Sequence, residues 1–168
     1  MPGSEVWRDA GQVTFRGQVL PEWIDRNDHM NVRAYDAVFE SAETAFYEGL
    51  GITHAYAAEQ RKGFFRLEKH LRYQAELRLG TPIVVTSFLV MTDLKRVQLF
   101  HQLWNAANGQ RSATLDCMAI HVDLETRKTG AMVRPDLVTA WLAMAQAHAG
   151  LPRPDGIGRR VTVERQDS

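Results

Sequence analysis

The stretch NVRAYDAVFESAETAFYEGLG, residues 31–51, predicts the longest helix of the chain. Its apolar side chains recur every three or four residues, which is the period of an α-helix that buries one face. Asn31 predicts the N-cap of this helix, and Gly49 or Gly51 predicts its end. Twenty residues at ~1.5 Å per residue give a rod of ~30 Å, long enough to cross a small sheet. The apolar stripe consists of Tyr35, Val38, Phe39, Ala42, Phe46 and Leu50.

Strand patterns precede and follow this helix. Residues 12–19 alternate between apolar and polar side chains, as half-buried strands do. Further strands are predicted at 65–73, 83–91, 97–104 and 113–122, separated by turn residues such as Asn108-Gly109. In the first of these, Phe65, Leu67, Leu71 and Tyr73 alternate with charged residues.

Shorter elements complete the pattern. Residues 52–61 predict a short helix or a loop, and Pro135 opens a C-terminal helix. Val161 and Val163 predict a short edge strand.

The order of these elements predicts an α+β fold. An antiparallel sheet of about five strands would wrap around one long helix, with an extra helix near the C-terminus. We expect an N-terminal tail at 1–10, one domain at 11–148 and a C-terminal tail at 149–168. Because one helix covers only one face of a sheet, the open face and edges predict a dimer.

Composition narrows the functional classes. The chain has 168 residues, which suits one domain, and its 20 basic and 20 acidic residues give no net charge to attract nucleic acid. Cys117 is the only cysteine, so an internal disulfide is excluded, and its apolar surroundings predict a buried strand residue. Charged residues near the start and short apolar runs predict no signal peptide, no membrane partner and a cytoplasmic location.

Several chemistries lack their motifs. The sequence has no Gly-x-Ser-x-Gly elbow, no phosphate-binding Gly-x4-Gly-Lys loop and no His-Glu-x-x-His pair. We therefore expect neither a serine hydrolase of the α/β type nor a resident metal.

The segment PEWIDRNDHMN, residues 21–31, precedes the long helix directly. Its spacing Asp-x-Asn-x-His-x-Asn resembles the motif of the hotdog-fold acyl-CoA thioesterases, the 4-hydroxybenzoyl-CoA thioesterase-like superfamily. The resemblance covers roughly residues 15–140 and is closest to the betainyl-CoA thioesterases of carnitine degradation. The stretches shared with that family are 22–25, 29–31, 70–73, 80–82 and 121–123.

The resemblance implies hydrolysis of a small acyl-CoA, with betainyl-CoA as a candidate substrate. Coenzyme A then enters as part of the substrate, and no cofactor is implied. Asp25 is expected to be the catalytic carboxylate, acting either as a general base on water or as a nucleophile. Asn27 is expected to hold a water or the thioester oxygen, and His29 to donate to the carbonyl or to orient Asp25. Each of these three residues has a purely structural alternative as a turn or support residue.

Other residues are candidates for substrate binding. Trp23 and Tyr35 are expected to line an acyl pocket, where aromatic faces beside a carboxylate would suit a quaternary ammonium group. Asn31 would either contact the substrate or only cap the helix. Glu68 and His70 share one strand face, and the resemblance implies that they complete the pocket of a neighbouring subunit in a homodimer or a dimer of dimers.

Further residues have open roles. Trp104 is an acyl-pocket candidate whose simpler role is core packing. Lys95, Arg96 and Arg111, at hairpin ends, would either meet coenzyme A phosphates or be ordinary solvated charges.

One residue departs from the family pattern. Asp28 stands where the family usually has glycine, which permits a positive φ. Aspartate tolerates the left-handed region better than most residues, so we expect the turn to survive. A second carboxylate near Asp25 would also repel an anionic acyl group.

Two other functions share this fold. A non-catalytic acyl-CoA binding module needs the pocket but not the carboxylate. An enoyl-CoA hydratase resembles Asp-x-x-x-x-His, with five steps between the two residues, whereas Asp25 and His29 are four apart.

Overall fold

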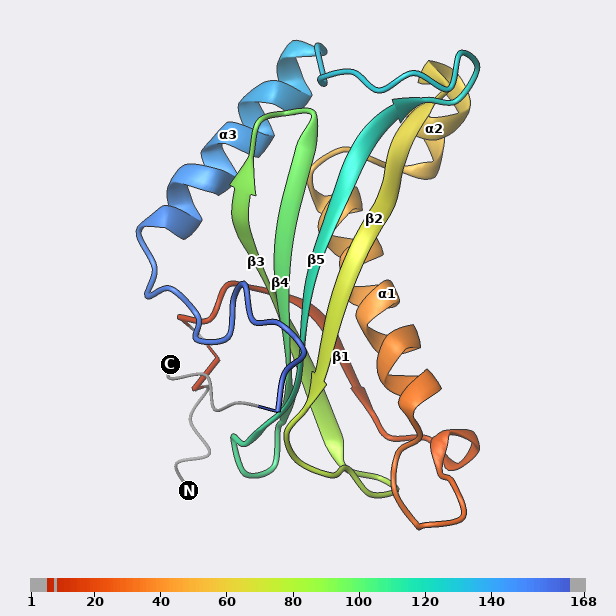
Figure 1. Cartoon of the computed structure of the whole chain (residues 1–168), viewed down its shortest axis with the longest axis vertical. Coiled ribbons are helices and arrows are strands. Elements are labelled where there is room, and N and C mark those ends of the chain that lie inside the picture. Colours follow the sequence, from red (N-terminus) through yellow and green to blue (C-terminus); the bar gives the residue numbers. More distant parts are fainter. Residues whose placement is uncertain (1–5, 8, 164–168) are drawn as a thin grey trace.

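One antiparallel sheet carries the fold, in the strand order β1-β3-β4-β5-β2. We describe residues 6, 7 and 9–163 of a computed structural model (Figure 1). The predicted α+β architecture is confirmed, with a long helix against the sheet and a second one near the C-terminus. The elements are β1 (Gln12–Gln18), α1 (Val32–Gly49), α2 (His54–Gln60), β2 (Lys62–Tyr73), β3 (Pro82–Thr92), β4 (Arg96–Asn105), β5 (Arg111–Asp123) and α3 (Pro135–Ala149).

Helix α1 begins and ends where its sequence predicts. Asn31 has an extended backbone, and its Oδ1 accepts the N–H of Ala34 at 3.0 Å. At the other end, Gly51 has a φ of 89° and donates its N–H to the carbonyl of Glu48 at 3.0 Å. The buried face carries Ala34, Tyr35, Val38, Phe39, Ala42, Glu43 and Phe46. No helix among the described residues is long and apolar enough to cross a membrane.

The core lies between α1 and the inner face of the sheet. Phe39 and Phe46 are fully buried, and burying a side chain of this size contributes roughly 2–3 kcal/mol to stability. Alternate residues of β4 and β5 face the core, among them Leu99, Leu115 and Cys117. The prediction that Cys117 is a buried strand residue is therefore confirmed.

Strand β2 contains a bulge that its sequence pattern did not reveal. The register with β5 shifts between Arg66 and Glu68, so Leu67 has no partner residue. Because of the bulge, the residues that face the core before Leu67 are the ones that the simple alternation placed on the solvent face. Phe64 packs against the core, whereas Phe65 and Leu67 are 42% and 54% exposed. The simple alternation predicted for this strand is therefore wrong before the bulge.

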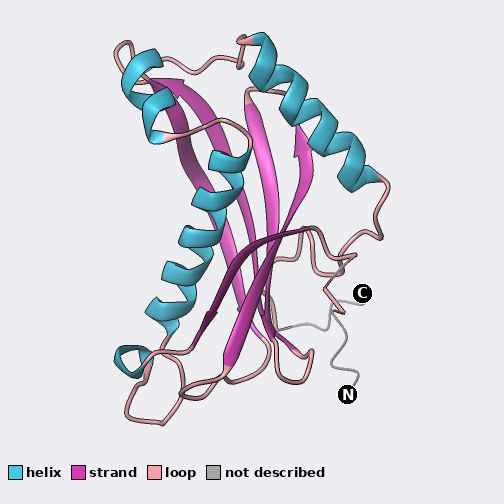
Figure 2. Cartoon of the chain, turned by 180° about the vertical axis from the view of Figure 1, so that it is seen from behind, coloured by secondary structure: helices cyan, strands magenta, loops and turns pink. Residues whose placement is uncertain are grey.

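Helix α3 runs beside β3 at the edge of the sheet (Figure 2), and its buried side chains belong to the same core as those of α1. Trp141 is fully buried, with its ring centroid 6.2 Å from Phe46 and 5.5 Å from Phe64. A Cβ added at Gly51 would lie 2.6 Å from Leu137 Cδ2. Position 51 therefore requires glycine for two reasons: the backbone has a positive φ where α1 ends, and a side chain would clash with α3.

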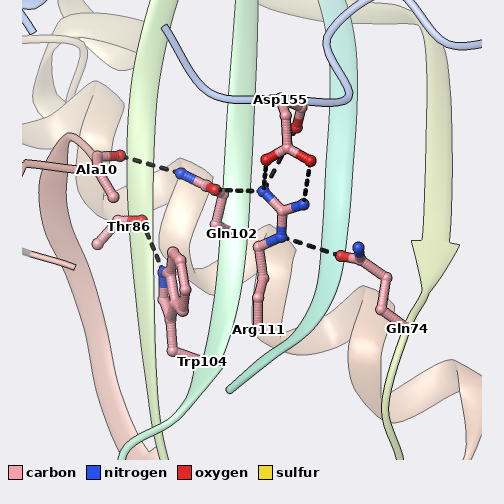
Figure 3. Close-up of polar contacts among 7 residues, drawn as sticks. All are labelled: Ala10, Gln74, Thr86, Gln102, Trp104, Arg111 and Asp155. Atoms are coloured by element: carbon pink, nitrogen blue, oxygen red, sulfur yellow. Dashed lines mark hydrogen bonds and ion pairs between the residues drawn. The ribbon is translucent and has the colours of Figure 1, made fainter. Parts of the chain in front are cut away.

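Parts of both segments expected as tails pack on the outer face of the sheet. Arg111 binds Asp155 through two nitrogens, at 2.7 and 2.9 Å (Figure 3). Gln102 accepts from Arg111 at 2.8 Å, and its Nε2 donates to the carbonyl of Ala10 at 3.3 Å. The Arg111 side chain is only 13% exposed, so it is neither an ordinary solvated charge nor a ready phosphate contact.

Two details near the ends differ from expectation. Val161 and Val163 form no strand, and both are almost fully exposed, so no apolar burial stabilises a strand there. Trp7, inside the expected N-terminal tail, is buried. Residues 1–5, 8 and 164–168 lie outside the described part of the chain.

Three buried histidines lie within or against the sheet. His101 is fully buried and its Nδ1 lies 2.7 Å from Ser87 Oγ. Desolvation by burial lowers the pKa of His101 from 6.5 to about 3. Burial also lowers the pKa of His121 and of His148, whose Nδ1 accepts the N–H of Leu89 at 2.8 Å. Burial thus favours the neutral form of all three imidazoles in the folded protein.

Stability should therefore fall in mild acid. Below pH ~6.5 the unfolded chain takes up protons at these histidines while the folded chain does not, so the free energy of unfolding decreases as pH drops. His101→Gln should flatten this dependence between pH 7 and pH 5, as measured by urea unfolding. His54→Gln, at an exposed histidine, is the matched control and should leave the wild-type slope unchanged. An identical slope for all three proteins would contradict the assignment.

Candidate active site

The motif residues 25–29 form a tight turn before α1. Asp25 donates its N–H to the carbonyl of His29 at 3.0 Å, and Asp28 donates to the carbonyl of Asp25 at 3.1 Å. Asp25 Oδ1 accepts the N–H of Asn27 at 2.8 Å. Asp28 has a φ of 61°, so the turn survives with aspartate in the left-handed region, as expected.

Asn31 joins this turn to the helix. Its backbone N–H and its Nδ2 both donate to the carbonyl of Trp23, at 2.7 and 2.8 Å. Its Oδ1 caps α1 through Ala34. The first N–H groups of a helix have no partner within the helix. The N–H groups of Val32 and Arg33 are then left at the positively polarised start of α1.

A cavity of about 300 Å³ opens beside this helix start. Tyr35 from α1 and Tyr73 from the end of β2 meet there edge to face, with ring centroids 5.2 Å apart. His29 Nε2 lies 2.8 Å from Glu76 Oε2, without hydrogen-bond geometry. Desolvation by burial raises the pKa of Tyr35 to about 12, which keeps its phenol neutral. The lining residues are His29, Met30, Val32, Tyr35, Tyr73, Gln74, Ala75 and Glu76.

The structure brings some of the predicted site residues together and separates others. His29 and Tyr35 share the cavity, and Asn31 caps the helix beside it. Asp25 is half-buried in the same turn but does not line the cavity, and Asn27 is exposed. Their catalytic roles remain predictions, because the turn orients the Asp25 carboxylate without showing what it acts on.

The other aromatic candidates have structural contacts. Trp23 is half-buried against the core, and its carbonyl is the anchor for Asn31. Trp104 donates its Nε1–H to Thr86 Oγ1 at 3.1 Å, on the face of the sheet that carries Gln102 and Arg111 (Figure 3). Trp104 thus contributes nothing to this cavity.

Glu68 and His70 lie in a different cavity, on the sheet. It measures about 320 Å³ and also includes Asp116 and Arg159. Asp116 Oδ2 accepts the N–H of Gly158 at 2.7 Å, so the C-terminal segment closes part of this space. Within one chain, Glu68 and His70 therefore do not join His29, and their role in a neighbouring subunit stays a prediction.

Sequence reasoning missed three residues of the cavity beside α1. Tyr73 ends β2, and Gln74 and Glu76 follow it; none of the three was a candidate for the site, although Tyr73 lies in the shared stretch 70–73. Long-range contacts bring them to the start of α1: β2 pairs with β5 up to Tyr73, and the N–H of Met30 donates to the carbonyl of Leu77 at 2.8 Å.

One group of possible metal ligands exists among the described residues. Ligand atoms of Glu43, His101 and Cys117 lie within 4.8 Å of one another in the core. Glu43 is paired with the guanidinium of Arg66, and this fixed positive charge opposes a metal cation at the same place. The group is best described as a buried ion pair beside a neutral histidine.

Comparisons with known proteins agree with this architecture. The family model described as the thioesterase-like superfamily matches residues 19–146. A betainyl-CoA thioesterase of Pseudomonas aeruginosa is 32% identical over 149 residues, covering 89% of this chain and 93% of the relative. An L-carnitine dehydrogenase/betainyl-CoA thioesterase of Rhizobium meliloti is 34% identical over 149 residues. That match covers 88% of this chain but only 29% of the relative, so this chain spans less than a third of it.

A solved structure shows the same fold. A Staphylococcus aureus protein in complex with CoA superposes with a TM-score of 0.84 at 24% identity, covering 92% of this chain and 97% of the other. The family resemblance drawn from the motif is therefore confirmed. The chain belongs to the thioesterase-like superfamily.

Proposed function

We propose that this protein hydrolyses a small acyl-CoA thioester to a free acid and coenzyme A. The observation that carries the proposal is the capped start of α1, which opens onto a cavity beside the turn that bears Asp25 and His29. Family membership supports it, since both curated relatives described above carry thioesterase in their names. The proposed enzyme needs no cofactor.

In the proposed reaction, the start of α1 activates the thioester carbonyl for attack. A thioester carbonyl held near Val32 would be polarised by the free N–H groups and the positive end of the helix dipole. Such donors stabilise the negative oxygen of the tetrahedral intermediate, and each commonly contributes ~3 kcal/mol to lowering the barrier. Asn31 has an indirect role here, because its cap holds the donors in place.

Asp25 contributes to the attack in one of two ways. As a general base it takes a proton from water, the hydroxide adds to the carbonyl carbon, and the carbon–sulfur bond then breaks to release the thiolate. As a nucleophile its oxygen adds instead, the thiolate leaves, and water hydrolyses the resulting anhydride. The hydrogen bond from the Asn27 N–H fixes the carboxylate in either case.

The acyl group that we propose is betaine. The curated relatives are named for betainyl-CoA, and one of them matches over nearly its whole length. The cavity volume of about 300 Å³ is at the lower end of the range for ligand pockets, which suits a short acyl group.

A binding module without catalysis is the second candidate. The fact that favours it is that Asp25 does not line the cavity in the single chain. Thermal stabilisation by an acyl-CoA without release of thiol would support this alternative. Hydration of crotonyl-CoA, assayed alongside, would instead support a hydratase.

We also propose a homodimer, with strand β2 at the interface. This strand is an edge of the sheet, and it exposes the apolar side chains of Phe65, Leu67 and Tyr73. Val32, at the start of α1, is also exposed. An exposed apolar edge strand favours pairing with a second chain. A second copy would then bring its own residues to the mouth of the cavity.

The dimer can be tested by light scattering after size-exclusion chromatography. We expect the mass of two chains for the wild type and a shift toward one chain for Leu67→Glu, which places a charge on the exposed edge. Arg16→Glu, at an exposed position on the opposite edge strand, is the control and should keep the dimer. A wild type that elutes with the mass of one chain would refute the proposal.

Replacing the proposed catalytic carboxylate should abolish turnover. Asp25→Asn keeps the side-chain oxygen that accepts from Asn27 but removes the base or nucleophile, so kcat should fall at least about a hundredfold with little change in KM. Free thiol released from betainyl-CoA is the readout. Asp28→Asn, which tolerates the same left-handed backbone, should retain activity. Full activity in Asp25→Asn would remove Asp25 from the mechanism.

Loss of the helix cap should affect stability and rate together. Asn31→Ala removes the acceptor for Ala34 and one donor to Trp23, which should lower the free energy of unfolding by about 1 kcal/mol. Because the oxyanion donors lose their support, kcat should also fall, by about tenfold. Thr53→Ala, at the cap of α2, should cost similar stability without changing kcat. Equal kcat losses in the two variants would show that the cap of α1 has no special role.

A further inference from the structure

We propose that Tyr35, Tyr73 and Glu76 form the recognition site for a quaternary ammonium group on the acyl chain. This inference rests on the proposed thioesterase function and assigns its specificity to three residues, of which Tyr73 and Glu76 were not candidates for the site from the sequence. It predicts that the protein selects positively charged acyl groups over neutral ones of the same shape.

The first argument is the arrangement of the two rings. Tyr35 and Tyr73 line the same cavity, with their centroids 5.2 Å apart and their planes at 84°. Two rings at right angles form two walls of a corner, and aromatic faces attract quaternary ammonium ions through their negative π-surfaces. Tyr35 is a neutral phenol with a raised pKa, so it offers a ring and not a second charge.

The second argument is charge. None of the eight residues that line the cavity is a lysine or an arginine, whereas Glu76 contributes a carboxylate. Arg33 and Arg72 are sequence neighbours of Val32 and Tyr73, but neither lines the cavity. On β2 and β5, Lys69 pairs with Asp36 and Arg111 pairs with Asp155. A positive group therefore meets attraction in this cavity, and an anionic acyl group meets repulsion.

The third argument is distance along the substrate. In a betaine-type acyl group a single methylene separates the cationic nitrogen from the carbonyl carbon. The cation site must then adjoin the site of reaction. His29 and the two tyrosines line one cavity of about 300 Å³, and Val32 at the start of α1 lines it as well. The cation corner and the proposed oxyanion donors are thus close enough to serve one short substrate.

The test compares two substrates that differ only in charge. Betainyl-CoA carries a trimethylammonium group, and 3,3-dimethylbutanoyl-CoA carries a neutral tert-butyl group in its place. The readout is the ratio of their kcat/KM values, which cancels any general loss of catalysis or folding. We expect the wild type to favour betainyl-CoA at least tenfold.

Three variants locate the source of this preference. Tyr73→Leu should lower the ratio about tenfold, while Tyr73→Phe keeps the ring and should leave it within about twofold of the wild type. Glu76→Gln should lower it about threefold, and less so at high salt, because this side chain is 70% exposed. Because the Tyr73 side chain is half-exposed, both Tyr73→Leu and Tyr73→Phe should fold, and thermal unfolding will verify this.

The outcomes separate this inference from the proposed function. A ratio near one in the wild type, or an unchanged ratio in Tyr73→Leu and Glu76→Gln, would overturn the cation site while leaving the thioesterase activity standing. No thiol release from either substrate would overturn the proposed function. In that case the dissociation constants of the same two compounds, measured by calorimetry, test the cation site, and equal values would reject it.

Discussion

The side-chain amide of Asn31 is the contact on which the site depends. It binds the helix with its oxygen and the preceding turn with its nitrogen, so two segments with different backbone conformations are held by one residue. The backbone N–H of Asn31 strengthens the same anchor at Trp23, and Met30 adds a bond to the carbonyl of Leu77 at 2.8 Å. These bonds give the start of α1 a fixed position relative to His29 and the end of β2.

The sequence predicted this part of the molecule well because the interactions are local. The cap, the apolar stripe of α1 and the turn at Asp28 all involve residues within a few positions of one another, so spacing and residue type were sufficient. Short turns between β3, β4 and β5 make these three strands neighbours, whereas the pairings of β1 with β3 and of β2 with β5 join strands that are not consecutive. Family resemblance then added chemical roles that periodicity alone cannot provide.

What the sequence did not predict involves residues far apart in the chain. The bulge at Leu67 depends on how β2 meets β5, and no single-residue signal marks it. Arg111 has three separate partners on the outer face, and its partner Asp155 comes from a segment expected to be free (Figure 3). Glu76 likewise enters the site only through the folded sheet, although nothing about its neighbours in sequence suggests a functional role.

The tight approach of α3 at Gly51 has a consequence for how related sequences diverge. Any side chain at position 51 would meet both an unfavourable backbone angle and the Leu137 methyl group. In a relative that has glycine at position 51, α3 can pack as it does here. A relative with another residue there needs a smaller side chain at position 137 or a different position of α3. Positions 51 and 137 should therefore covary among related sequences.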